Sequence, residues 1–252
     1  MIEIKNVTKY FGKKKVIDEV STVFEKGKIT SLIGANGAGK STLIGIITRL
    51  IQADEGEIII EDRPLKQWKE QELARKISIL RQSNHLNMSL TIRELISFGR
   101  FPYTQGKLTK SDWLVVDQAI EYMNLADIQD KYLEQLSGGQ KQRAFIAMIL
   151  AQDTQYIFLD EPLNNLDMKH SAEIMKLLVK LVEDFGKTII LVIHDINFAS
   201  IYSHNIVGMK NGRLLYQGRV DEIVTSEHLK ELFEMEIPIR EIEGKKIAFY
   251  YQ

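Results

Sequence analysis

A run of small residues near the start of the chain has the spacing of a phosphate-binding loop. Residues 34–41 read Gly-Ala-Asn-Gly-Ala-Gly-Lys-Ser, which fits the pattern G-x-x-x-x-G-K-[ST] in full. Glycines let the backbone wrap tightly, so that N–H groups point at phosphate oxygens, and a helix N-terminus adds partial positive charge. In such a loop we expect Lys40 to reach the β- and γ-phosphates of a nucleotide and Ser41 to bind Mg²⁺.

Two carboxylates follow a short apolar run later in the chain. Residues 156–159 read Tyr-Ile-Phe-Leu, and Asp160 and Glu161 come directly after them. A buried parallel strand carries its C-terminal residues to the edge of the sheet where ligands bind. We therefore expect Asp160 to lie near Mg²⁺. Glu161 would face the γ-phosphate, where it can accept a proton from the attacking water.

A second glycine turn lies between these two motifs. Residues 136–140 read Leu-Ser-Gly-Gly-Gln and precede a stretch with helical periodicity. Ser137 can cap that helix, and the two glycines leave backbone N–H groups open to an anion. A simple capped helix start is an alternative that composition alone does not rule out.

The elements that must position these motifs alternate between strands and helices. Apolar runs predict strands at residues 2–7, 16–24, 29–33, 57–60, 76–80, 156–159 and 189–193. Helical patterns cover residues 40–50 and 171–185 and dominate residues 84–151. This alternation predicts an α/β fold with a parallel sheet, interrupted by a helical block. Residues 237–251 alternate around Glu243 and Gly244, which predicts a hairpin.

The composition excludes some classes of protein. Lys and Arg total 33 against 34 Asp and Glu, for a net charge of −1, which argues against a protein built to coat nucleic acid. There is no cysteine, and hence neither a disulfide nor a thiolate metal site. The N-terminus does not read as a secretory signal, and the apolar runs are far shorter than the roughly 20 residues that span a bilayer. We expect a soluble chain that a partner holds at any membrane.

The combination of the three motifs resembles the ABC ATPase family. Leu-Ser-Gly-Gly-Gln stands between the phosphate loop and Tyr-Ile-Phe-Leu-Asp-Glu-Pro, and the order and separations match over essentially the whole chain. The resemblance implies a P-loop NTPase fold with a mostly parallel sheet, an N-terminal antiparallel β subdomain and an inserted helical subdomain. Within one ATPase domain, residues 1–252, it assigns 1–83 and 152–252 to the core and β subdomain. Residues from about 84 to 151 form the helical subdomain, which contains the signature turn, residues 136–140.

The resemblance also implies roles for residues that no local motif identifies. Phe11 matches the aromatic that stacks on adenine, Gln82 the Q-loop glutamine that senses Mg²⁺ and water, and His194 the switch histidine at the γ-phosphate. Residues 164–167 match the D-loop, where Asn164 and Asn165 replace the usual Ser and Ala before Asp167. The expected nucleotide contacts are Phe11, Gly34, Asn36, Gly37, Ala38, Gly39, Lys40, Ser41, Thr42, Ser137, Gly138, Gly139, Gln140 and Asp167. The expected catalytic residues are Lys40, Gln82, Glu161 and His194, and the expected Mg²⁺ ligands are Ser41, Gln82 and Asp160.

In this family the signature turn of one subunit closes on ATP held by the phosphate loop of another. The resemblance therefore implies an ATPase that uses ATP and Mg²⁺ and works as a head-to-tail homodimer. Such a motor drives separate membrane permease subunits, acts indirectly with a solute-binding protein, and lies at the cytoplasmic face of a bacterial membrane. Nucleic acid is not an expected partner.

Local features favour one transport group. Residues 90–95, 98–103, 143–148 and 194–199 resemble the siderophore, haem and vitamin B12 importers, and we favour a ferric siderophore as cargo. Haem or vitamin B12 import and a stand-alone exporter subunit are alternatives. A DNA or ribosome ATPase is disfavoured, because such proteins usually carry two cassettes or a long coiled-coil insertion. The segment from about residue 82 to 103, with Arg100 and Phe101, is the expected contact with the permease.

Overall fold

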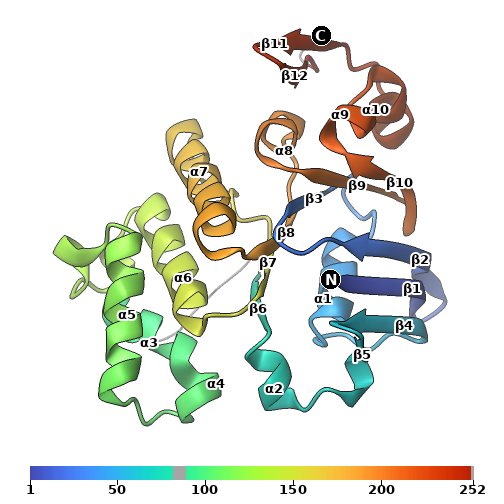
Figure 1. Cartoon of the computed structure of the whole chain (residues 1–252). Coiled ribbons are helices and arrows are strands. Elements are labelled where there is room, and N and C mark those ends of the chain that lie inside the picture. Colours follow the sequence, from blue (N-terminus) through green and yellow to red (C-terminus); the bar gives the residue numbers. More distant parts are fainter. Residues whose placement is uncertain (82–88, 251–252) are drawn as a thin grey trace. The chain divides into compact units, whose positions relative to one another are not determined.

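The computed structural model describes residues 1–81 and 89–250, and Figure 1 labels its helices and strands. The chain divides into two units. The first unit comprises Met1–Trp68 and Met175–Gln252, and the second comprises Lys69–Ile174. One helix, α7 (Met168–Phe185), crosses the boundary between the units.

An antiparallel sheet opens the first unit. Strand β1 (Ile2–Phe11) pairs on one side with β2 (Lys14–Phe24) and on the other with β4 (Glu55–Ile60). The short β5 (Arg63–Pro64) extends the sheet beyond β4, and a 3₁₀ turn, η1 (Leu65–Gln67), follows it. The expected N-terminal antiparallel sheet is therefore confirmed.

A mostly parallel sheet forms the core of the first unit. Strand β3 (Ile29–Ile33) pairs in parallel with β8 (Thr188–Val192) and with β9 (Asn205–Lys210), and β10 (Arg213–Arg219) closes antiparallel on β9. Every residue of β3 and β8 is buried. Strands covered on both faces need continuous apolar runs, which explains why these two were recognisable in the sequence. The predicted α/β fold is confirmed.

The C-terminal part of the first unit ends in the predicted hairpin. Its strands are β11 (Ile239–Ile242) and β12 (Lys245–Ala248). The side-chain amide of Asn197, on α8, donates to the carbonyl of Ala248 at 3.1 Å and accepts from the Ala248 N–H at 2.7 Å. These paired bonds attach the hairpin to α8. The helices of this unit are α1 (Lys40–Ile47), α8 (Ile196–Tyr202), α9 (Val220–Ile223) and α10 (Ser226–Phe233).

The second unit combines two parallel strands with a cluster of helices. Strand β6 (Ile77–Leu80) pairs in parallel with β7 (Tyr156–Asp160). Helices α3, α5 and α6 pack against one another through buried apolar side chains such as Leu95, Val116 and Phe145. The helical elements are α2 (Glu70–Ala74), α3 (Ile92–Ser97), η2 (Phe98–Arg100), α4 (Phe101–Thr104), α5 (Lys110–Tyr122), η3 (Ala126–Ile128), η4 (Leu133–Gln135) and α6 (Gly138–Gln152).

Helix α5 is anchored at its first turn by a buried carboxylate. Asp112 accepts hydrogen bonds from the hydroxyl and backbone N–H of Thr109, which caps the helix, and from the guanidinium of Arg100 at 3.0 Å. The side chains of Arg100 and Asp112 are only 11% and 8% exposed. These bonds, first those from Thr109 and then that from Arg100, lower the pKa of Asp112. Asp112 thus fixes α5 against the turn that contains Arg100.

Over the described part of the chain, no helix combines the length and the apolar character that crossing a bilayer requires.

Two aspartates on α5 allow the buried ion pair to be tested against a surface one. We expect Asp112→Ala to lower the free energy of unfolding by about 3 kcal/mol, because it leaves the Arg100 guanidinium buried without its carboxylate. Asp117→Ala removes a carboxylate that pairs with Arg93 at the surface, where the Asp117 side chain is 48% exposed. The loss of unfolding free energy should therefore stay below about 1 kcal/mol. Urea denaturation of the full chain measures both values, and equal losses would contradict the assignment.

The same pair should show a characteristic dependence on pH. Because the pKa of Asp112 is lowered in the fold, its stabilising effect is present above the ordinary aspartate pKa of about 3.9 and is lost as pH falls through the lowered value. The difference in stability between the wild type and Asp112→Ala should therefore shrink in acid.

Candidate active site

The phosphate loop of the first unit has a backbone that only glycine can adopt at two positions. At Gly34 (φ 141°), an added Cβ would lie 2.1 Å from the carbonyl oxygen of Met209. Gly39 caps α1 with φ 100°, and its Cβ would meet the side chain of Ile17 at 2.7 Å. Between them residues 35–37 are exposed, so the outer face of the loop is open to a ligand.

Lys40 places a positive charge inside this loop. It is the first residue of α1, is 5% exposed, and its ammonium donates to the carbonyls of Gly34 at 2.7 Å and Ala35 at 3.0 Å. The ammonium and the helix N-terminus both attract anions, and their positive potentials add at the loop. Ser41 is exposed and Thr42 is half-buried on the first turn of the helix. The loop therefore has the charge and the shape that a triphosphate requires.

The parallel register brings His194 to the same end of the sheet as the loop. Leu32 of β3 lies opposite Val192 of β8, and the N–H of Ile193 donates to the carbonyl of Leu32 at 3.3 Å. His194 follows directly and is exposed, while Asp195 caps α8. The first unit thus gathers the phosphate loop and His194 at the carboxyl ends of neighbouring strands.

Phe11 lies at the end of β1 with 51% of its surface exposed. The ammonium of Lys9 lies 5.6 Å from its ring centroid, and the neighbouring Tyr10 is less exposed, at 37%. A large, exposed aromatic ring can stack on a base. The exposure of Phe11 is therefore compatible with the stacking on adenine that is expected of it.

The acidic pair belongs to the second unit. The first four residues of β7 are buried and Asp160, its last, is half-buried. Glu161 follows in the left-handed region, at φ 54°, which is unusual for a non-glycine residue and marks local strain. The side-chain amide of Asn164 donates to a carboxylate oxygen of Glu161. This contact holds the carboxylate of the predicted general base.

The signature turn forms a reciprocal cap at the start of α6. The Ser137 hydroxyl accepts from the Gln140 N–H at 3.3 Å, and the Gln140 side chain accepts from the Ser137 N–H at 3.0 Å. Ser137 and Gly138 are exposed, whereas Gly139 is buried. The second unit therefore carries Asp160, Glu161, the signature turn and the exposed Asp167, and the first carries the phosphate loop, His194 and Phe11. Gln82 lies outside the described residues.

Oxygen donors suited to Mg²⁺ stand on both units. The Ser41 hydroxyl is exposed on the first turn of α1, and the Asp160 carboxylate is half-buried at the end of β7. Magnesium prefers hard oxygen ligands and is usually held by one or two such groups together with phosphate oxygens. The chemistry of these residues therefore fits the expected ion.

Arg100 and Phe101, the pair expected at the permease, have different environments. The Arg100 guanidinium donates to Asp112 and to the carbonyl of Ala151 at 2.9 Å, and it lies 4.0 Å from the Tyr103 ring centroid. Phe101 is 58% exposed and Phe98 is 47% exposed. Arg100 therefore stabilises the fold of the second unit, and the two phenylalanines form its exposed surface here.

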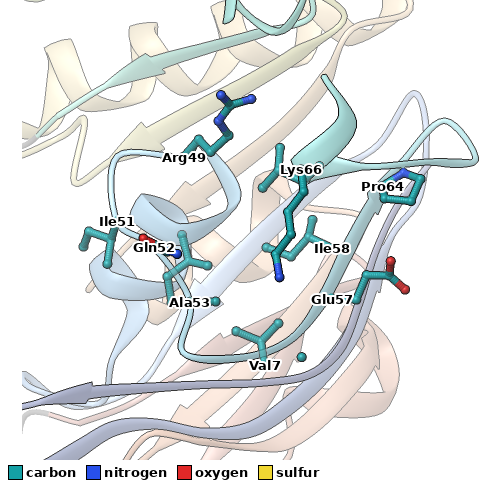
Figure 2. Close-up of a pocket in the computed structure, with 12 residues that line it drawn as sticks. Val7, Arg49, Ile51, Gln52, Ala53, Glu57, Ile58, Pro64 and Lys66 are labelled. Atoms are coloured by element: carbon teal, nitrogen blue, oxygen red, sulfur yellow. The ribbon is translucent and has the colours of Figure 1, made fainter. Parts of the chain in front are cut away.

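A cavity of about 430 Å³ lies in the first unit, away from the phosphate loop. It adjoins the C-terminal end of α1, whereas the loop adjoins the N-terminal end, and Ile46, Ile58 and Leu65 form part of its wall. Figure 2 shows the Lys66 side chain reaching over it and the Arg49 guanidinium turned away, where it donates to the Trp68 carbonyl at 2.7 Å. The cavity is thus separate from the phosphate-binding residues.

Two contacts in the segment after the acidic pair are not predictable from its motifs. The first is the hydrogen bond from the Asn164 amide to the Glu161 carboxylate. The second is the contact between the ring Nδ1 of His170 and a carboxylate oxygen of Asp167, at 2.8 Å. For the first contact the available signal was the replacement of the usual D-loop serine by Asn164, because an amide carries its N–H donors on a longer side chain than a hydroxyl.

Comparison with known proteins gives consistent matches. A family model described as ABC transporter matches residues 17–164. The petrobactin import ATP-binding protein YclP of Bacillus subtilis (strain 168) is 59% identical over 251 residues, which span 100% of both chains. The petrobactin import ATP-binding protein FatE of Bacillus anthracis is 44% identical over 99% of this chain and 100% of that protein.

A solved structure agrees in fold and in sequence. It is the dimeric post-hydrolysis state of an ATP-binding cassette bound to ADP and Pi, with a TM-score of 0.76 at 30% identity. The match covers 87% of this chain and 99% of that chain.

The contact between Asn164 and Glu161 leads to a kinetic prediction. Asn164→Ala should lower kcat for ATP hydrolysis by at least about 10-fold, because one hydrogen bond to a charged group contributes roughly 1.5–3 kcal/mol. The KM for ATP should change less than about twofold, because ATP binding would rest on the phosphate loop. Asn164→Ser retains a donor and should recover part of the rate. A steady-state ATPase assay tests this, and an unchanged kcat in Asn164→Ala would refute it.

Proposed function

The chain belongs to the ABC transporter family, and on that premise we propose that it is the ATP-hydrolysing motor of an importer for ferric siderophores. Support comes from the full-length similarity to two proteins that are named for petrobactin import, at 59% and 44% identity. The segments of this sequence that resemble the siderophore importers support the same cargo. A motor subunit of this kind does not touch the cargo, so the proposal rests on its similarity to dedicated import subunits.

We assign nucleotide binding first to the phosphate loop. The buried ammonium of Lys40 and the backbone of residues 34–42 hold the β- and γ-phosphates, and the exposed ring of Phe11 stacks on adenine. Mg²⁺, held by Ser41, Gln82 and Asp160 together with phosphate oxygens, would neutralise charge on the triphosphate.

Hydrolysis is then assigned to two residues at strand ends. The Glu161 carboxylate, oriented by Asn164, accepts a proton from the attacking water. His194 donates a hydrogen bond to the γ-phosphate and steadies it during transfer, and Gln82 orients the water. Catalysis here consists of positioning and charge stabilisation, which demands rigid supports such as the buried strands β3, β7 and β8.

The second half of each site comes from another copy of the chain. Ser137 and Gly138 are exposed at the start of α6, where backbone N–H groups and the helix dipole suit a phosphate. Because one chain carries one phosphate loop and one signature turn, a head-to-tail homodimer completes two sites. ATP closes this pair and hydrolysis reopens it.

The permease contact is assigned to the segment from about residue 82 to 103, at the start of the helical block. Phe101 and Phe98 are large apolar side chains exposed on the same short segment, and such residues are enriched in the buried centres of interfaces. The permease subunits would hold the chain at the cytoplasmic face of a bacterial membrane. A solute-binding protein would deliver the cargo to them.

The proposed function can be tested by replacing the 59% identical relative. A Bacillus subtilis strain that lacks YclP should recover uptake of iron-labelled petrobactin when it expresses this chain. Lys40→Ala should abolish the recovery, because the loop then lacks its ammonium. If the wild-type chain hydrolyses ATP in vitro but restores no uptake, the proposed cargo is wrong.

The permease contact can be tested in the same strain. Phe101→Ala should lower petrobactin uptake about 10-fold, because it removes an apolar anchor of the interface, and should leave ATP hydrolysis by the isolated chain unchanged. Leu114→Ala is the matched control, since Leu114 is 63% exposed on α5 of the same unit but lies outside the proposed contact. Equal uptake in the two variants would argue against Phe101 as a contact.

A further inference from the structure

His170 holds the D-loop aspartate from two directions. It lies in the first turn of α7, and its backbone N–H donates to the Asp167 carboxylate at 2.8 Å. Its ring Nδ1 lies 2.8 Å from each of the two carboxylate oxygens of Asp167. A carboxylate can only accept hydrogen bonds, so Nδ1 carries the proton. The hydrogen bonds from His170, the backbone bond first, lower the pKa of Asp167.

The same ring closes over the signature turn. A Cβ built on Gly139 would lie 2.4 Å from Cδ2 and 2.8 Å from Cγ of His170, so the ring occupies the space that a larger residue would need. At Gly138 a Cβ would lie 3.6 Å from the carbonyl oxygen of Asn165 and from Leu166. The D-loop and the signature turn therefore pack together within the second unit, with the His170 ring between Asp167 and Gly139.

A weaker contact joins the same two helices further along. The guanidinium of Arg143 on α6 lies 3.5 Å from a carboxylate oxygen of Glu173 on α7, and the two side chains are 27% and 41% exposed. A partly exposed ion pair of this kind contributes little to stability. The His170 contacts, which combine two hydrogen bonds with close packing, are the stronger connection.

We propose that His170 is a positioning residue that fastens Asp167 to the signature turn, so that both motifs meet the nucleotide of the partner subunit as one rigid body. This inference rests on the proposed head-to-tail pair. Groups that are already ordered before association lose less entropy when they bind, and the pair therefore closes at lower protein concentration. No contact with the nucleotide is assigned to His170 itself.

Three variants separate the two functions of the ring. His170→Phe keeps an aromatic ring against Gly139 and loses the Nδ1 donor. His170→Asn loses most of the ring but keeps an amide N–H near the position of Nδ1. Glu173→Gln removes the nearby ion pair and serves as the matched control.

The experiment uses the full chain with Glu161→Gln, which should bind ATP without hydrolysing it. Light scattering with saturating ATP and Mg²⁺ gives the protein concentration at which half of the chains are dimeric. We expect His170→Phe to raise this concentration about 10-fold, His170→Asn to stay within about threefold of the parent, and Glu173→Gln within about twofold. A fluorescent ATP analogue, added at protein concentrations too low for dimers, should bind all variants equally. Thermal unfolding checks that each variant is folded.

The outcomes separate this inference from the proposed function. A parent that stays monomeric with ATP overturns the head-to-tail pair, and the inference falls with it. A parent that dimerises while His170→Phe dimerises equally well overturns the inference alone. If His170→Phe and His170→Asn weaken dimerisation equally, the inference is also overturned, because the hydrogen bond to Asp167 would then not account for the effect.

Discussion

A buried ammonium group is the constraint around which the phosphate loop is built. Lys40 is 5% exposed, and burial of a charged group is unfavourable unless hydrogen bonds or opposite charge compensate it. Two backbone carbonyls, of Gly34 and Ala35, accept from its ammonium and compensate part of this cost. A bound triphosphate would supply negative charge as well, so a position that is expensive for folding would be favourable for binding.

This arrangement depends on the sheet that supports it. The loop can bend around the ammonium because Gly34 approaches the Met209 carbonyl more closely than any Cβ allows. Strand β3, which leads into the loop, is buried over its whole length between β8 and β9. A rigid, buried strand fixes where the loop begins, and α1 fixes where it ends. The loop is thus held at both of its ends.

The segment from Glu161 to His170 concentrates strain and contacts in the second unit. Glu161 adopts a left-handed backbone, and its carboxylate accepts from Asn164, only three residues away. Asp167 is held in turn by His170, again three residues away. A strained backbone conformation at a functional site persists only when the surrounding contacts hold it in place. These short-range hydrogen bonds are part of the contacts that do so here.

The motifs and most of the elements that carry them could be predicted from the order of the residues. The phosphate loop, the acidic pair and the cap at Ser137 are local patterns, because their chemistry depends on neighbours along the chain. Boundaries were less accurate: α1 ends at Ile47 rather than near Leu50, and Arg49 already has φ 64°. Three features became apparent only in the folded chain: Arg100 pairs with Asp112, Phe101 is exposed, and the His170 ring covers Gly139. These last contacts join residues on different helices, and the packing of a side chain between helices leaves no periodic trace in the sequence.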